Sequence, residues 1–484
     1  MKKYFIIILS LIAFSTSNSC SERDLFLPAE SSDPIDAINS EDRMQMFLNS
    51  GYIAMGSSST YGTDLMVFGD LLGDKMFVTN ANPQFAITSS YAYNADTNDF
   101  GFYGKIYDAI MNCNLVINTT GLPPSENISR IKAEAKILRA MAYFTLVNYY
   151  SPTPTSGVNQ EYGVPLVLGN YDSTIVPARA SVAEIYSQII ADLNDGLIHA
   201  SDIPQQKVLM SKTAAKLLLA KVYLTRRAAG DAELALGFAS DIVNNPSARF
   251  APVEKANYPK YFGGNGSQDA DAENQAETIW ELDMNQNTNN LTGVGANTSL
   301  PGYLYRVGDR KCLMFRKGFY DSFPDSDIRK GTPAAGLLTP TGASNADSPM
   351  GVWTNKYPRF TSGGNFVRNI KVLRFADAQL SRIEALHLTG QNALALTELN
   401  EFAASRNGST YTGADLLEDI LTERAKEFYG EGQRFLDLKR YNKPISKESN
   451  CTACSVPAND KLFVLPMSEN ALNYNPNLTQ YPGY

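Results

Sequence analysis

The chain has 484 residues, of which 44% are hydrophobic and 19% are charged, a balance typical of a globular protein with a large core. Its formal net charge is −8, its isoelectric point is about 5.1, and no long basic run occurs. These values exclude a nucleic-acid-binding surface, because phosphate binding needs clustered lysine and arginine side chains.

The N-terminus has the features of an export signal. Two lysines precede a short apolar stretch, Phe5 to Phe14, which is too short to span a bilayer. Small residues then lead to Cys20. This arrangement resembles a bacterial lipobox. It predicts a signal peptide over residues 1–19, acylation of Cys20, and a lipidated tether over residues 20–39.

The residues around this cysteine bear on where the protein resides. Ser17 stands where a lipobox usually has an aliphatic residue, so a plain secretory signal with a chance cysteine is the alternative. The short segment 21–24 resembles the acidic tag that sends Bacteroidetes lipoproteins to the outer face of the outer membrane. No later segment is apolar enough to cross a membrane. We therefore expect a chain that is lipid-anchored in the cell outer membrane and faces the exterior.

From residue 40 onward the dominant pattern is helical. Apolar residues at helical spacing predict helices over residues 40–55, 101–118, 131–150 and 182–199. The helix at 182 is preceded by a capping box, in which the side chains of Ser181 and Glu184 bond each other's backbone N–H groups.

Two helical hairpins then follow one plan. Residues 213–229 and 231–244 are predicted to pair across Gly230, and residues 372–389 and 391–405 across Gly390. A glycine at the joint supplies the left-handed conformation that ends the first helix of each pair. This arrangement is typical of a tetratricopeptide-like repeat.

Two long insertions, near residues 65–100 and 246–374, are rich in Gly, Asn, Pro and Tyr. The second contains a short predicted strand, Thr278 to Leu282. We expect a mainly α fold: a tetratricopeptide-like helical-hairpin scaffold with long loop-rich insertions and a few short strands. No low-complexity linker divides the chain, so residues 40–484 are predicted to form a single domain.

Four cysteines follow the lipobox: Cys113, Cys312, Cys451 and Cys454. The close pair at 451 and 454 could belong to a zinc site, but zinc needs two further ligands at suitable spacing. The only two histidines lie inside helical patterns. In an oxidising compartment a local disulfide or two free thiols is favoured over metal. We expect no metal and no cofactor.

Several segments, in chain order, carry a family resemblance. They are residues 134–144, 162–167, 214–224, 374–385, 423–440 and 465–484. Together they resemble the SusD/RagB family of outer-membrane nutrient-binding lipoproteins. The resemblance implies a fold of tetratricopeptide-like helix pairs and a partner, a SusC-like TonB-dependent outer-membrane transporter. It also implies an oligosaccharide ligand or, in some members, a peptide.

The segment 423–440 is dense in charge: it holds Glu423, Arg424, Glu427, Glu431, Arg434 and Asp437. Paired carboxylates could perform acid–base chemistry. Alternating acids and arginines favour a structural ion-pair network instead, because a carboxylate paired with arginine stays ionised and cannot act as a general acid near neutral pH. The protein is therefore predicted not to be an enzyme, and no catalytic residue is assigned.

Sugar recognition needs flat rings that stack on the C–H face of a pyranose, and amide or charged groups that bond its hydroxyls. In the family such residues tend to come from the loop before the second helix and from the central insertion. The predicted ligand-binding residues are Tyr91, Tyr93, Asn94 and Asp96 in the loop, and Asn287, Tyr303, Tyr305 and Arg306 in the insertion. The scarcity of tryptophan, with only Trp280 and Trp353, puts a starch ligand in doubt, and both are assigned to the core.

The sequence thus predicts a cell-surface lipoprotein that binds a glycan and passes it to its transporter. One alternative is a peptide- or glycopeptide-binding member of the same family. The others are a glycoside hydrolase with two carboxylates flanking a cleft, and a pure scaffold that binds only proteins.

Overall fold

The structure is a computed structural model. It describes residues 38–80, 82–172, 174–263, 272–284, 298–304, 310–332, 336–341, 350–358, 368–448, 451 and 453–484. The long helices are α3 (Glu41–Met55), α6 (Phe102–Ile117), α7 (Glu126–Tyr150), α8 (Val182–His199), α9 (Lys212–Arg226), α10 (Asp231–Asn244), α14 (Phe375–Leu388), α15 (Asn392–Ala404) and α16 (Leu416–Phe428). The shorter ones are α4 (Asp64–Leu71), α5 (Ala86–Ser89), α11 (Tyr258–Tyr261), α12 (Leu300–Leu304), α13 (Lys317–Asp321), α17 (Arg434–Arg440) and α18 (Glu469–Tyr474).

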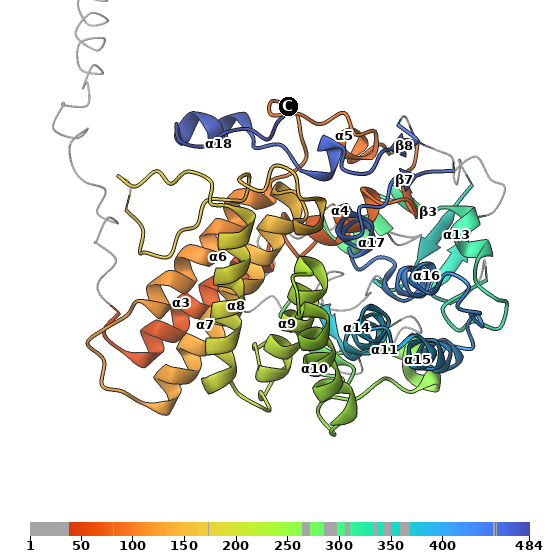
Figure 1. The fold of residues 1–484 in the computed structure, drawn as a ribbon, viewed down its shortest axis with the longest axis horizontal. Coiled ribbons are helices and arrows are strands. Elements are labelled where there is room, and N and C mark those ends of the chain that lie inside the picture. The colour runs from red at the N-terminus through yellow and green to blue at the C-terminus, as the bar shows by residue number, and fades with distance from the viewer. Residues whose placement is uncertain are drawn as a thin grey trace, which may run out of the picture.

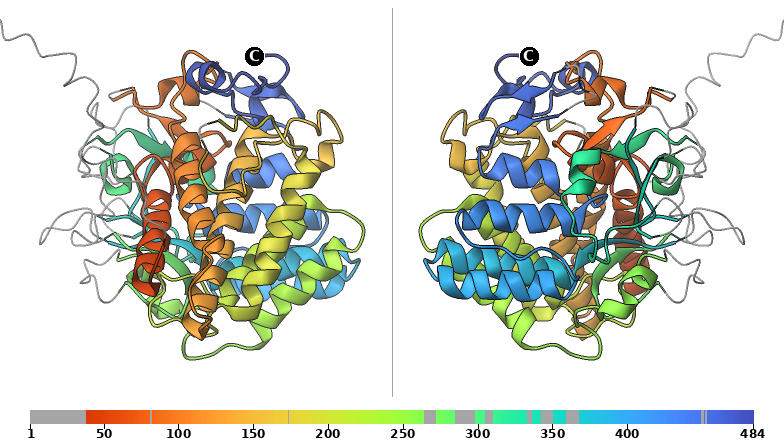
Figure 2. Two further views of the ribbon diagram at one scale, coloured as in Figure 1. Left: turned by 90° about the vertical axis from the view of Figure 1, so that its left-hand side faces the viewer. Right: turned by 90° about the vertical axis from the view of Figure 1, so that its right-hand side faces the viewer.

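The long helices stack as a series of antiparallel neighbours, which confirms the predicted helical-hairpin scaffold. α3 packs on α6, α6 on α7, α7 on α8 and α8 on α9; α10 then joins α9 to α14, which contacts α15 and α16. Figure 1 shows α3, α6, α7 and α8 side by side in one half of the molecule and α14, α15 and α16 in the other. Figure 2 shows the C-terminal segment lying across one end of the helices. The capping box at Ser181 is present, with both of its hydrogen bonds.

Short antiparallel strands join the insertions to this scaffold. β1 (Met76–Val78), β3 (Leu313–Phe315), β5 (Val352–Thr354) and β4 (Leu338–Pro340) form a four-stranded sheet in that order. β2 (Thr278–Leu282) pairs with β6 (Ile370–Arg374), and β7 (Ile445–Ser446) pairs with β8 (Ser455–Val456). The strand predicted at Thr278 to Leu282 is confirmed.

Three predicted helix boundaries are wrong. The helix expected from residue 131 begins at Glu126, because the Ser125 side chain caps it there. The helix expected from residue 372 begins at Phe375, because residues 370–374 pair with β2 as strand β6. The helix expected to run to residue 229 ends at Arg226, where Arg227 takes the left-handed conformation with φ of 51°. Gly230, also left-handed, starts α10 instead of ending α9.

The charge-rich segment 423–440 forms a buried ion-pair network, as predicted. Arg374 donates to Glu431 at 2.7 Å, to Glu277 at 2.9 Å and to Glu427 at 3.1 Å, and all four side chains are almost fully buried. Burial alone would raise the pKa of the Glu427 carboxyl, but the guanidinium groups of Arg406, Arg374 and Arg329 hold it well below its usual range. A carboxylate held ionised in this way has a structural role.

This network is tied to α4 through the turn at residues 430–432. Gly430 and Gly432 have φ of 77° and 71°, and their N–H groups donate to one carboxylate oxygen of Asp70 at 2.6 and 3.4 Å. The turn approaches α4 so closely that a Cβ at Gly69 would overlap the Gly432 carbonyl oxygen. Glycine is therefore required on both sides of the contact.

Of the four described cysteines, two form a disulfide and two are free. Cys451 and Cys454 form a disulfide with a Cα–Cα distance of 5.2 Å, which closes the β7–β8 hairpin. Cys113 and Cys312 are free and buried, and burial raises the pKa of each thiol to about 12.

No three His, Cys, Asp or Glu side chains are grouped to hold a metal ion in the part of the chain that the structure describes. Within the same residues, no helix is both long and apolar enough to cross a membrane.

Candidate functional site

The loop between β1 and α6, predicted to bind the ligand, contains two aromatic residues in an uncommon backbone conformation. Phe85 has φ of 60° and Tyr91 has φ of 56°. A bulky residue at positive φ is strained, and such strain persists only where surrounding contacts fix the backbone. Here the Thr88 backbone N–H and hydroxyl both donate to Asp99, at 3.2 and 2.6 Å. The loop is therefore held in a defined shape.

The prediction that Tyr91 and Tyr93 present their rings to a ligand is wrong for this structure. Tyr91 is 7% exposed and Tyr93 is 3% exposed. Their hydroxyls donate to the backbone carbonyls of Leu72 and Leu462, each at 2.6 Å. Tyr91 is also covered by the Lys447 ammonium group, 4.2 Å from its ring centroid. Both rings serve as packing that joins the loop to α4 and to the C-terminal segment.

Asn94 and Asp96 occupy the exposed tip of the same loop. The Asn94 side-chain oxygen accepts from the backbone N–H groups of Asp96 and Thr97, each at 2.9 Å, so this oxygen is used to shape the turn. The Asp96 carboxylate is exposed. Only these two of the four predicted loop residues face solvent.

Tyr303, predicted from the central insertion, does meet the loop. Its ring packs edge-to-face on Phe85 with centroids 5.0 Å apart, and Phe85 packs in the same way on Phe68 at 5.5 Å. Tyr303 is 6% exposed, whereas Phe85 is half-buried. Asn82 adds a hydrogen bond from its amide to the Arg310 carbonyl at 2.7 Å. The loop and the insertion thus come together at the contact between Phe85 and Tyr303, and Phe85 is the less buried of the two residues.

An acidic pair lies beside these rings. Burial raises the pKa of the Asp64 carboxyl to about 7, and the neighbouring charge of Asp99 adds to the shift. Burial raises the pKa of Tyr303 to about 12, and Asp64 contributes to this shift as well. Neither carboxylate was predicted from the sequence, because nothing in the local sequence indicates that they interact across 35 residues of chain. Carboxylates beside a ring can accept hydrogen bonds from hydroxyls.

A groove of about 1050 Å³ runs along the seam of α3 and α6 and reaches Ser58, whose carbonyl accepts from the Asp64 N–H at 2.9 Å. Amide side chains line its edge, but they bind the scaffold: Asn112 donates to the Asp108 carbonyl at 2.8 Å, and Asn118 donates to the Leu168 carbonyl at 2.9 Å. These two amide groups are therefore already used within the scaffold.

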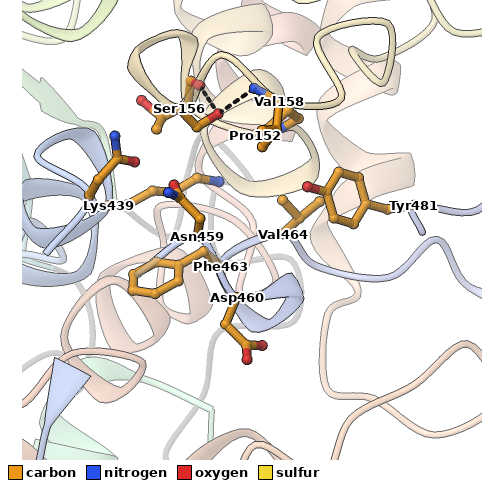
Figure 3. A pocket seen from close by; sticks show the side chains of 11 residues that line it. Pro152, Ser156, Val158, Lys439, Asn459, Asp460, Phe463, Val464 and Tyr481 are labelled. Carbon is orange, nitrogen blue, oxygen red and sulfur yellow. Dashed lines mark hydrogen bonds between the residues drawn. The ribbon is translucent and has the colours of Figure 1, made fainter. Parts of the chain in front are cut away.

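A much smaller cavity, of about 20 Å³, lies where the C-terminal segment meets the loop after α7 (Figure 3). Pro152, Ser156 and Val158 line one side, and Phe463 and Tyr481 line the other. This volume holds about one water molecule. The cavity is too small for a nutrient ligand.

Other predicted residues lie outside the described part of the chain. They are Asn287, Tyr305, Arg306 and the acylation site Cys20. Trp280 and Trp353 are buried, as predicted, with 0% and 2% exposure.

Comparison with known proteins identifies the fold. A sequence profile described as starch-binding and associating with the outer membrane matches residues 26–224, and the profile of the SusD family matches residues 268–484. The chain belongs to the SusD/RagB family.

Individual SusD-like proteins agree over most of the chain. A SusD-like protein of Bacteroides ovatus is 26% identical over 408 residues, which are 74% of this chain and 67% of that protein. SusD-like protein P2 of Formosa agariphila is 25% identical over 531 positions and covers 100% of both chains. The crystal structure of a SusD superfamily protein from Bacteroides vulgatus has a TM-score of 0.80 at 22% identity, covering 92% of this chain and 99% of that one. The SusD architecture explains why long insertions are mounted on a helical frame.

Proposed function

We propose that this SusD/RagB protein binds an oligosaccharide on the surface formed by Phe85, Asp64 and Asp99. The observation that supports it most directly is the contact of the Phe85 ring with Tyr303, close to Asp64, whose charge acts on both Tyr303 and Asp99. The ring stacks on the apolar face of a sugar, and the carboxylates accept from its hydroxyls. The starch-binding description of the matching profile supports a glycan as the ligand class.

The protein acts without catalysis in this proposal. It is anchored in the outer membrane by lipid on Cys20, faces the exterior, and passes its ligand to a SusC-like TonB-dependent transporter. The carboxylates of the segment 423–440 are not available for hydrolysis, because they are paired with arginines inside the core. Incubation with glycans should therefore yield no cleavage products.

The binding proposal is tested by isothermal titration of the mature chain against panels of oligosaccharides and of peptides. Phe85→Leu keeps an apolar side chain in the loop but removes the ring. It should weaken glycan binding roughly 5- to 10-fold, because an aromatic contact contributes about 1 kcal/mol. Tyr474→Leu is the matched control: that ring is 85% exposed and lies on α18, so its loss should leave affinity unchanged.

The outcomes separate the hypotheses. Binding to peptides alone would assign the protein to the peptide-binding branch of the family. Unchanged glycan affinity in a folded Phe85→Leu protein would place the glycan site elsewhere. Labelling with radioactive palmitate in wild type but not in Cys20→Ser would verify the anchor.

A further inference from the structure

The groove along α3 and α6 has an apolar floor. α3 contributes Phe47, Ile53 and Ala54, and α6 contributes Met111 and Leu115. All except Ala54 keep part of their surface accessible. An accessible apolar groove of about 1050 Å³ along two adjacent helices is large enough for a chain segment.

The N-terminal tether joins the described structure at this groove. Ile38 lines the groove and is 8% exposed, so the chain enters the body of the protein at the groove floor. The tether contains the apolar triplet Leu25-Phe26-Leu27 among mostly acidic and small residues. The matching sequence profile starts at residue 26, so most of the tether falls within the region shared with the family.

We propose that the tether folds back along the groove, antiparallel to α3, and seats the triplet 25–27 near Ser58. The lengths agree. α3 has 15 residues, and a helix of that size is about 22 Å long. The eleven residue steps from Leu27 to Ile38 span at most about 36 Å when extended. The triplet can therefore reach the far end of the groove.

The docked tether changes how far the protein can move from the membrane. This consequence rests on the proposed lipid anchor at Cys20. An undocked tether of eighteen steps would allow a reach of about 60 Å between the acyl chains and Ile38. Docking leaves only the seven steps from Cys20 to Leu27, a reach of about 23 Å. The lipid would then leave the protein near Ser58, beside the proposed ligand site, and the site would be held close to the membrane.

Cross-linking in the full mature chain carrying Cys20→Ser tests the docking independently of any ligand. Leu27→Cys combined with Ser58→Cys should form an intramolecular disulfide under mild oxidation. Leu27→Cys combined with Ser187→Cys, an exposed position on α8, is the matched control and should react at least fivefold more slowly. Equal rates for the two pairs would overturn the proposal. So would disulfide-linked dimers of the Ser58→Cys pair, which would assign the groove to a second copy.

Proteolysis gives a second readout without new cysteines. Cleavage after Glu30 by a glutamate-specific protease should be at least tenfold slower in wild type than in the variant with Leu25→Ser, Phe26→Ser and Leu27→Ser. Equal cleavage rates would show that the triplet does not protect the tether. The groove would then be open to another partner, such as the transporter, and the proposal would fail. Neither readout uses the ligand, so a failed glycan titration leaves this test intact.

Discussion

Replacing Arg374 by methionine should destabilise the protein strongly, because this guanidinium pairs with three buried carboxylates. It lies 2.7 Å from Glu431, 2.9 Å from Glu277 and 3.1 Å from Glu427, and its side chain is 1% exposed. Removing one partner from a buried ion pair costs about 3–5 kcal/mol, since the remaining charge stays buried. An unfolding entropy of about 2.1 cal/mol/K per residue gives roughly 0.9 kcal/mol/K for roughly 450 residues. The expected fall in Tm is therefore about 3–5 °C.

The assay is thermal unfolding followed by circular dichroism at pH 7. Arg382→Met is the matched control, because Arg382 also forms an arginine–glutamate pair, with Glu398 at 2.7 Å, but both side chains are partly exposed. That pair should contribute about 1 kcal/mol or less, or a Tm change of about 1 °C. If the Arg374 variant melts within 1 °C of the Arg382 variant, the network does not carry the stability assigned to it.

The pH dependence of the same pair of variants gives a further check. In wild type the pKa of Glu427 is held low by its arginines, so its contribution to stability is present above the unfolded pKa and lost as pH falls through the folded pKa. In the Arg374 variant the carboxylates that have lost their arginine partner can take up protons as pH falls, which removes their buried charge. The Tm gap between wild type and the variant should therefore narrow from pH 7 to pH 4.5. A gap that widens would contradict this account.

Three further predictions concern packing, protonation and the disulfide. Gly69→Ala should lower Tm by about 1–3 °C, because the new methyl group overlaps the Gly432 carbonyl and overpacking costs about 1–3 kcal/mol. An unchanged Tm would mean that the turn can move. Asp64→Asn should raise Tm at pH 8 but not at pH 4, because the wild-type carboxyl, with its pKa raised to about 7, loses stability as pH rises from about 4 through 7; a gain at both pH values would point to a cause other than ionisation. Reducing the Cys451–Cys454 disulfide opens a small loop whose closure contributes about 2 kcal/mol, so Tm should fall by about 2 °C and amide exchange should rise in the β7–β8 hairpin; exchange that rises elsewhere but not in the hairpin would contradict this assignment.

Local signals predicted the scaffold well and failed where a distant partner decides the structure. The capping box at Ser181 marks a helix start using only residues within one turn, and the structure retains it. Residues 370–374 lie next to a helical pattern, and only their pairing with β2, about ninety residues earlier, makes them a strand. The local sequence does not indicate which strand these residues pair with.

The same distinction explains the outcome for the site. The two regions predicted from the sequence do lie together in the structure, since Tyr303 meets the β1–α6 loop. Sequence reasoning chose the wrong rings, because an exposed and a buried tyrosine look alike in a loop. The acceptor for Tyr93 is the carbonyl of Leu462, 369 residues away.

The most recognisable motif of the chain and its proposed site are connected through α4. The segment 423–440 holds the turn at residues 430–432, and that turn donates to Asp70 on α4. The first residue of α4 is Asp64, whose charge acts on Tyr303. The buried charge network is therefore linked through one helix to a carboxylate of the proposed site.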